Sequence, residues 1–191
     1  MSGSVAPSPQ AVVLVEGVSD RIALEALARR RGRDLAAEGV SIVPIGGAQA
    51  IGRFLDRFGP PGAGLSLAGL CDVGEEDDFR RALERAGFGY QLTRSDMEKL
   101  GFYVCVVDLE DELIRANGAA AVEELLDAHG DLVPFRTLQK QAAWRGRATE
   151  EQLRRFMGSG GSRKLRYARL LVEALDLAWA PVPLDGVLAH V

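Results

Sequence analysis

Acidic residues follow three apolar runs of the sequence, each close to the point where the run ends. They are Glu16 and Asp20 in VEGVSD, Asp72 in CDVGEEDD, and Asp108 and Glu110 in VVDLEDEL. Carboxylates gathered in one place repel one another unless a cation neutralises them. Their hard oxygen atoms suit Mg²⁺ or Mn²⁺, which commonly take one or two carboxylates plus waters and substrate phosphates. The sequence therefore predicts a divalent-metal site, provided that the fold brings these run ends together.

The apolar runs are predicted to be strands of one parallel sheet. They are short, continuous and rich in β-branched residues, as is typical of strands buried on both faces. Helical patterns alternate with them, which favours right-handed βαβ crossovers and an α/β fold with about four strands. The predicted strands are 11–15, 40–44, 65–71 and 102–107, with helices from Ser19, over 48–58 and 75–86, and up to Asn117. In such a sheet the carboxyl ends of the strands meet at one edge, where ligands bind.

The strand pattern stops after about Gly130, and helical signals continue over 135–143, 149–157 and 163–175. Thr149, followed three residues later by Gln152, is a capping box that marks a helix start. We therefore expect a flexible N-terminal tail over residues 1–10 and an α/β domain over residues 11–130. Residues 131–191 are expected to form a helical C-terminal extension packed on or beside that domain.

Composition predicts a cytoplasmic protein that does not enter a membrane. No run approaches the ~20 apolar residues that a membrane-spanning helix needs. The first ten residues, MSGSVAPSPQ, lack the basic and apolar regions of a secretory signal. Cys71 and Cys105 each lie inside an apolar run, where a small buried side chain is expected, and this fits a reducing compartment.

Charge is distributed unevenly along a chain whose net charge is −4. Residues 131–191 hold ten Lys and Arg against six Asp and Glu, and residues 1–130 hold 13 against 21. The basic residues that we predict to contact phosphate backbone are Arg163, Lys164, Arg166 and Arg169 at the start of one helix, with Arg154 and Arg155 nearby. A merely solvated helix face is the alternative interpretation.

Several other polar and aromatic residues have simpler interpretations. Glu75 to Asp78 are expected to be helix N-terminal charges favoured by the helix dipole, whereas Glu16, Asp72 and Asp108 directly follow strands. Trp144 and Trp179 lie in the helical part, and we expect them in the core or an interface rather than stacked on bases. No Ser accompanies a His and an Asp in a way that would favour serine hydrolysis.

The sequence resembles the Toprim domain, most of all that of the OLD (overcoming lysogenisation defect) family of nucleases. The motifs that carry the resemblance are VEGVSD after the first predicted strand, Asp after the third and Asp-Leu-Glu after the fourth. The resemblance covers about residues 11–117 and, more loosely, the C-terminal helices. The metal ligands that it implies are Glu16, Asp20, Asp72, Asp108 and Glu110. A lysine beyond the core sheet assists catalysis in that family, and Lys164 is the residue that we match to it. Glu16 and Lys164 are thus the implied catalytic residues.

The sequence departs from that family in two ways. Toprim domains usually carry Asp-x-Asp after the third strand, but Asp72-Val73-Gly74 has Gly in place of the second Asp, which puts a second metal and activity itself in question. The sequence leaves open whether Glu75 substitutes for the missing Asp. OLD nucleases usually carry an ATPase domain ahead of the Toprim domain, and no Walker A motif occurs in this sequence. We therefore expect any ATPase to be a separate subunit.

These observations predict a Mg²⁺- or Mn²⁺-dependent nuclease that cleaves phosphodiester bonds in DNA rather than RNA. A small Toprim ribonuclease is one alternative. A non-catalytic Toprim module that binds nucleic acid or acts as a scaffold for a separate ATPase is the other, and Gly74 favours it. A topoisomerase is disfavoured, because strand passage needs a tyrosine nucleophile domain for which this short chain has little room.

Overall fold

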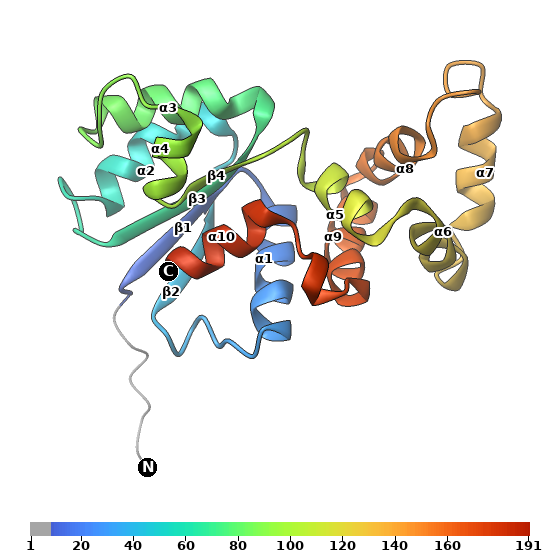
Figure 1. The fold of residues 1–191 in the computed structure, drawn as a ribbon, viewed down its shortest axis with the longest axis horizontal. Coiled ribbons are helices and arrows are strands. Elements are labelled where there is room, and N and C mark those ends of the chain that lie inside the picture. The colour runs from blue at the N-terminus through green and yellow to red at the C-terminus, as the bar shows by residue number, and fades with distance from the viewer. Residues whose placement is uncertain (1–8) are drawn as a thin grey trace, which may run out of the picture.

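The computed structural model describes residues 9–191 and contains the predicted parallel sheet (Figure 1). Of the N-terminal tail predicted over residues 1–10, residues 1–8 lie outside the described residues. The strands are β1 (Ala11–Val15), β2 (Val40–Pro44), β3 (Ser66–Asp72) and β4 (Phe102–Cys105). They pair in parallel in the order β2-β1-β3-β4, with Val15 opposite both Pro44 and Leu70. The predicted α/β fold with C-terminal helices is confirmed.

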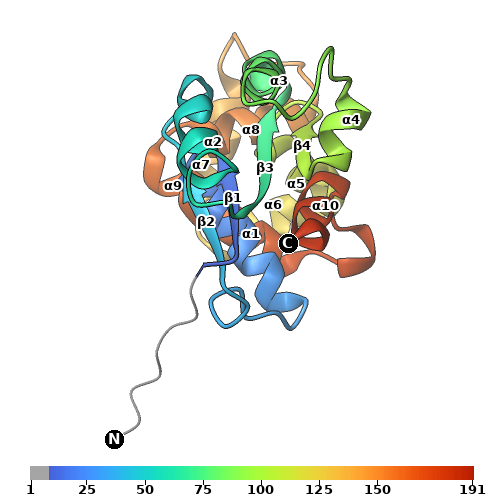
Figure 2. The ribbon, with the colours of Figure 1, turned by 90° about the vertical axis from the view of Figure 1, so that its left-hand side faces the viewer.

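Helices cover both faces of the sheet, as Figures 1 and 2 show in two perpendicular views. One face carries α2 (Ile51–Phe58), α3 (Glu76–Arg85) and α4 (Arg94–Lys99). The other carries α1 (Val18–Arg30) and α10 (Val182–His190), the latter against β3 and β4. Three short 3₁₀ turns are η1 (Ala48–Ala50), η2 (Val73–Glu75) and η3 (Leu177–Trp179). Alternate residues of the buried strands therefore face two separate helical layers.

A group of helices lies beside the sheet, on the right in Figure 1. It consists of α5 (Leu109–Asn117), α6 (Ala119–Ala128), α7 (Leu132–Lys140), α8 (Thr149–Gly158) and α9 (Gly161–Ala174). α5 packs on α8 and α9, although the division that we predict at residue 130 would place α5 with the sheet. α9 also packs along α1, so this helical group is attached directly to the strand-end edge of the sheet.

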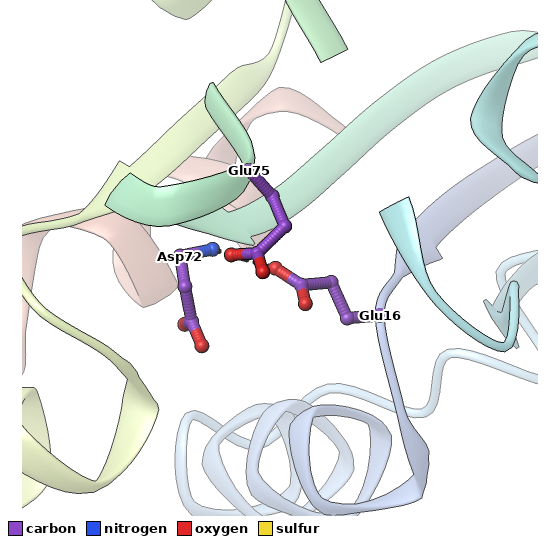
Figure 3. Close-up of side chains that lie close together, drawn as sticks. All are labelled: Glu16, Asp72 and Glu75. Atoms are coloured by element: carbon purple, nitrogen blue, oxygen red, sulfur yellow. Dashed lines mark hydrogen bonds between the residues drawn. The ribbon is translucent and has the colours of Figure 1, made fainter. Parts of the chain in front are cut away.

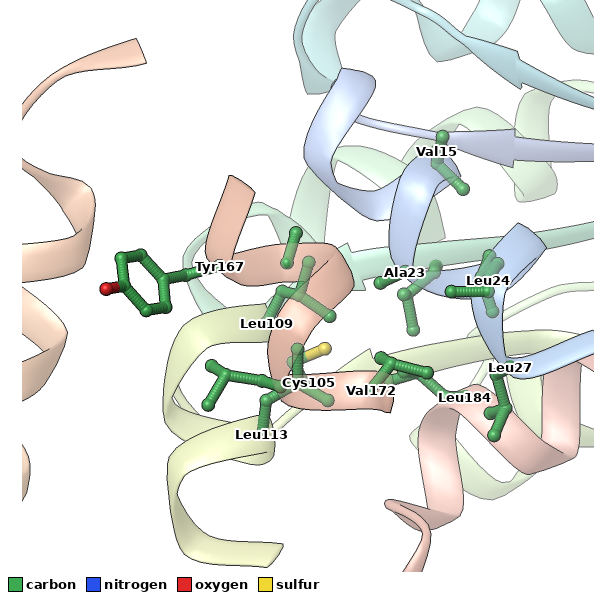
Figure 4. Close-up of a cluster of buried hydrophobic side chains, with 14 of the residues drawn as sticks. Val15, Ala23, Leu24, Leu27, Cys105, Leu109, Leu113, Tyr167, Val172 and Leu184 are labelled. Atoms are coloured by element: carbon green, nitrogen blue, oxygen red, sulfur yellow. The ribbon is translucent and has the colours of Figure 1, made fainter. Parts of the chain in front are cut away.

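The hydrophobic core explains how the sheet and the helical group are joined. Val13 and Val15 of β1 belong to a buried cluster that continues through Leu113 of α5 to Val172 of α9 (Figure 4). Val12 and Leu14 point to a second cluster, on the side of α2, α3 and α4. Burying one such side chain stabilises the fold by about 1.5–3 kcal/mol. Because one cluster is continuous from β1 to α9, the helices around the predicted site are held in place by the core of the sheet.

A polar contact reinforces this attachment. Nη1 of Arg30, at the end of α1, donates a hydrogen bond of 2.8 Å to the carbonyl oxygen of Val172 in α9. The Val172 carbonyl also accepts a hydrogen bond of 3.3 Å from the N–H of Leu175, which caps α9, and a cation near this helix C-terminus suits the helix dipole. No helix within residues 9–191 has the length and apolar character needed to cross a membrane.

Candidate metal centre

Three carboxylates meet at the carboxyl ends of β1 and β3. Glu16 directly follows β1, Asp72 is the last residue of β3, and Glu75 ends the turn η2 that follows β3. Each offers an oxygen atom, and these three atoms lie within 4.8 Å of one another. Figure 3 shows the side chains of Glu16 and Glu75 pointing toward each other beside the backbone nitrogen of Asp72. This spacing matches what a single cation with oxygen ligands requires.

The backbone of Asp72 fixes the position of Glu16. The N–H of Asp72 donates a hydrogen bond of 2.7 Å to Oε1 of Glu16, which leaves the second oxygen available for a ligand. Burial raises the pKa of Glu16 to about 7, and the charges of Glu75 and Asp20 add to that rise, while the Asp72 hydrogen bond opposes it. A pKa near neutrality shows that the folded chain by itself poorly stabilises the charged form of Glu16.

The pKa of Asp72 is raised further than that of Glu16. Burial raises its pKa to about 8, and the neighbouring charges, Glu16 first, contribute further. Its side chain accepts no hydrogen bond from any residue within the described range of 9–191. Within that part of the chain Lys164 interacts with Asp72 through its charge, yet the pKa of Asp72 stays raised, a condition that a bound cation would relieve.

Asp20 lies in the first turn of α1, where it also shapes the start of that helix. Its Oδ2 accepts a hydrogen bond of 2.7 Å from the N–H of Gly17, the residue that caps α1. The residue is only 9% exposed, and burial raises the pKa of its carboxyl to about 6 against the lowering effects of Gly17 and Lys164. Asp20 thus has a structural role through one oxygen and keeps the other for a ligand.

Glu110 and Lys164 form an ion pair between α5 and α9. Nζ of Lys164 lies 3.3 Å from Oε1 of Glu110, whose side chain is 8% exposed. This contact lacks hydrogen-bond geometry, so Oε1 is a buried oxygen without a hydrogen-bond partner among residues 9–191. Burial raises the pKa of Glu110, and the charge of Lys164 opposes that rise. The pKa of Lys164 is itself raised, because Glu110 and the neighbouring carboxylates outweigh the lowering effect of burial. Lys164 is accordingly a firmly charged cation facing the acidic residues.

Asp108 differs from the other predicted ligands because protein groups contact both of its oxygens. Oδ1 accepts a hydrogen bond of 2.8 Å from the N–H of Asp111 and so caps α5. Oδ2 accepts one of 2.5 Å from Nε of Arg154 in α8. In this arrangement Asp108 holds α5 and α8 together, and it would have to release Arg154 to bind a metal through Oδ2.

Comparison with known proteins identifies the domain that builds this arrangement. The family model for the TOPRIM domain of overcoming lysogenization defect protein-like proteins matches residues 10–65. Residues 10–65 thus resemble an OLD-like Toprim domain, and the chain has a Toprim-type fold. The matched segment contains Glu16 and Asp20, whereas Asp72 and the residues after it lie beyond the match.

Solved structures extend the likeness of the Toprim domain to the helical part. The C-terminal region of the OLD protein of Xanthomonas campestris pv. campestris has a TM-score of 0.75 at 22% identity and covers 95% of this chain and 91% of that chain. The C-terminal region of the Burkholderia pseudomallei OLD protein has a TM-score of 0.72 at 18% identity, with 95% and 96% covered. At such identities the likeness shows the fold. None of the curated proteins compared with the chain matches it.

Within the Toprim domain, the structure sorts the predicted site residues into two groups. Glu16 and Asp72 lie with Glu75, which the sequence left open between a helix N-terminal charge and a substitute for the missing Asp. Asp20 and Glu110 lie on the side of Lys164, and both influence the pKa of Asp72. The signal that identifies Glu75 is its place in η2, one residue before α3 begins, where its side chain turns back toward Glu16.

The basic residues of the C-terminal helices also separate into two sets. Arg166 pairs with Asp131, and Arg169 donates a 2.6 Å hydrogen bond to Glu173, so their charges are largely offset within the helical part. Arg154 and Arg155 of α8 line a cleft of about 430 Å³ together with Lys164 of α9, and Arg154 pairs there with Asp108. The cations next to the acidic residues are therefore on α8 and in the first turn of α9.

Proposed function

We propose that this OLD-like Toprim domain is a divalent-metal-dependent nuclease that cleaves phosphodiester bonds in DNA. The observation that carries the proposal is the meeting of Glu16, Asp72 and Glu75 at one strand-end edge, with oxygen atoms within 4.8 Å of one another. The raised pKa values of Glu16 and Asp72 fit Mg²⁺ or Mn²⁺ as the missing partner.

In this proposal Glu16, Asp72 and Glu75 hold the metal, and Asp20 and Glu110 belong to the same ligand set on its far side. A bound divalent ion would supply polarisation of a phosphate and a lowered pKa for a bound water. The chain's own residues do the positioning: the Asp72 N–H orients Glu16. Lys164, kept charged by Glu110, is placed to donate a hydrogen bond to an anionic phosphate oxygen.

A second candidate function is a non-catalytic Toprim module that binds nucleic acid or serves a separate ATPase as a scaffold. Gly74 favours it, because Gly stands where the family pattern places a second Asp. Glu75, three residues after Asp72, supplies a third carboxylate to the cluster, and this favours the nuclease. Activity measurements separate the two proposals.

Nicking of supercoiled plasmid by the purified protein, with Mg²⁺, Mn²⁺ or EDTA, tests the nuclease directly. We expect metal-dependent nicking that Glu16→Gln and Asp72→Asn each reduce by at least ~100-fold, since each removes a ligand charge while keeping the side-chain size. Asp77→Asn is the matched control, because Asp77 is an exposed carboxylate on the first turn of α3 that pairs with Arg80. A parallel RNA substrate decides between deoxyribonuclease and ribonuclease. Wild-type protein that cleaves neither polymer in either metal would contradict the proposal and favour the scaffold.

A further inference from the structure

A cleft beside the metal centre contains the one feature of the site that suits a base rather than a phosphate. It has a volume of about 430 Å³ and lies between α5 and α8, and the ion pair of Glu110 and Lys164 is part of its lining. The lining also includes Trp144, in the segment between α7 and α8, together with Arg147 and Arg155. Trp144 is part-exposed, so its ring is accessible from the cleft.

The charges of the cleft are arranged to attract an anion. Three of its cations face acidic partners that also line the cleft, in the pairs Arg154 with Asp108, Lys164 with Glu110 and, more loosely, Arg147 with Glu151 at 3.6 Å. Arg155 forms no ion pair with any residue in the described range 9–191. The cleft thus holds an unmatched positive charge next to the proposed metal, as a path for a phosphate backbone requires.

The ring of Trp144 lies among cations, and its backbone is anchored by a hydrogen bond. The guanidinium carbons of Arg147 and Arg155 lie 5.0 and 6.0 Å from its centroid. Nε2 of Gln152, a residue only 5% exposed, donates a 2.7 Å hydrogen bond to the Trp144 carbonyl oxygen. Gln152 in turn accepts one of 2.6 Å from Gln139 of α7. A buried polar network therefore positions the turn that carries Trp144, which a merely surface-exposed loop would not need.

The accessible ring of Trp144 and the charge of Arg155, unpaired within residues 9–191, indicate the kind of molecule that the cleft binds. We propose that the cleft binds a single-stranded segment of nucleic acid, with one unpaired base stacked on Trp144 and its backbone along Arg155 toward Lys164. A base inside a duplex has both faces covered by its neighbours, so a tryptophan can stack only on a base that has left the stack. The inference rests on the proposed function for its location, and it adds that the substrate presents an unpaired nucleotide next to the metal centre.

Tryptophan fluorescence in EDTA tests this binding without any cleavage. The chain has two tryptophans. Trp179 is 71% exposed in η3 and lines a different groove, so a Trp179→Phe variant reports on Trp144 alone. We expect an oligothymidylate to quench this variant's fluorescence, and we expect no quenching in Trp144→Phe, where only Trp179 remains.

Affinities supply the second readout. Trp144→Ala should lose about tenfold in affinity for the single strand, the usual effect of losing one stacked base, and little for a blunt duplex, while Trp144→Phe keeps a ring and most of the affinity. Arg155→Glu should lower the salt dependence of binding by about one counterion, unlike Arg85→Glu at the far end of α3. Absence of quenching, or equal losses by Trp144→Ala for single strand and duplex, would overturn the inference. Metal-dependent nicking would then still support the nuclease, so the two proposals fail separately.

Discussion

The acidic cluster should make the metal-free protein less stable than a variant that lacks one of its charges. Asp72→Asn is the perturbation that shows this most directly. The variant keeps the backbone N–H that bonds to Glu16, and within the described residues the Asp72 side chain has no hydrogen bond to lose. We therefore expect Asp72→Asn to unfold at a higher temperature than wild type in EDTA at pH 8, although it removes a residue of the proposed site.

The sign and size of the effect follow from the pKa of Asp72. Its folded-state pKa of about 8 lies above the ordinary value of 3.8. Between about pH 4 and pH 8 the folded protein therefore keeps a proton on Asp72 that the unfolded chain has lost. Stability therefore falls as the pH rises from about 4 toward 8. The full shift would cost the wild type roughly 3–4 kcal/mol between pH 5 and pH 8. Solvent contact at this part-buried carboxyl reduces the effect, so we expect about 2 kcal/mol, or roughly 4–8 °C in melting temperature.

Metal should reverse the order of stability. At a concentration 100 times its Kd, a bound ion adds about 2.7 kcal/mol to the unfolding free energy, and only wild type has the full ligand set. Thermal melts of both proteins at pH 5 and pH 8, in EDTA and in millimolar Mn²⁺, measure all the effects in one series. Asp77→Asn is the control, and it should change neither the pH dependence nor the metal response by more than ~0.5 kcal/mol. A wild type that is as stable as Asp72→Asn in EDTA at pH 8, or that ignores Mn²⁺, would refute the reasoning.

Three further substitutions test other parts of the structure. Lys164→Ala leaves Glu110 buried without its cation, so we expect the free energy of unfolding to fall by about 1–3 kcal/mol, more at pH 8 than at pH 5. Thermal melts measure this loss, and Lys164→Arg should largely restore stability. Gly69→Ala would place a Cβ 2.6 Å from the ring of Phe102, and we expect a destabilisation of about 1–3 kcal/mol in denaturant titrations. Gly74→Asp meets open space, and we expect faster Mg²⁺-dependent nicking with unchanged DNA affinity. If wild type is active, loses activity on Glu75→Gln and is matched by Gly74→Asp, Glu75 already completes the site.

Much of the sheet could be predicted because its signals are local. The run Ala11–Val15 is entirely buried and has the β-branched composition of an inner strand, and the predicted bounds of β1 and β2 match those observed. Sequence reasoning did not predict α10, because its place depends on distant contacts. A Cβ on Gly186 of α10 would lie 2.3 Å from the ring of Tyr103 in β4, so the fit is between residues far apart in the chain.

The candidate site could be predicted only in part, for a similar reason. Strand ends indicate which carboxylates share an edge, and on this basis Glu16 and Asp72 were expected together. They lie together in the structure with Glu75. Position along the chain does not show which oxygens the protein itself will occupy. β4 ends at Cys105 rather than at residue 107, so Asp108 lies three residues beyond it, and Arg154 from α8 contacts its carboxylate. That pairing depends on how the helical group packs, which no local pattern encodes.

The relation between Gly74 and Glu75 determines how the departure from the family pattern should be understood. The turn η2 covers Val73–Glu75, so the chain curls back once before α3 begins, and the third residue after Asp72 returns to the strand-end edge. Gly74 points into open space on this turn, whereas Glu75 reaches Glu16. A shift of one residue can thus restore a carboxylate that the sequence pattern lacks. If Glu75 interacted only with the helix dipole, its position near Glu16 and Asp72 would add repulsion without any stabilisation. Burial already raises the pKa values of those two carboxyls. The cation that we propose among the three would supply the reason for that placement.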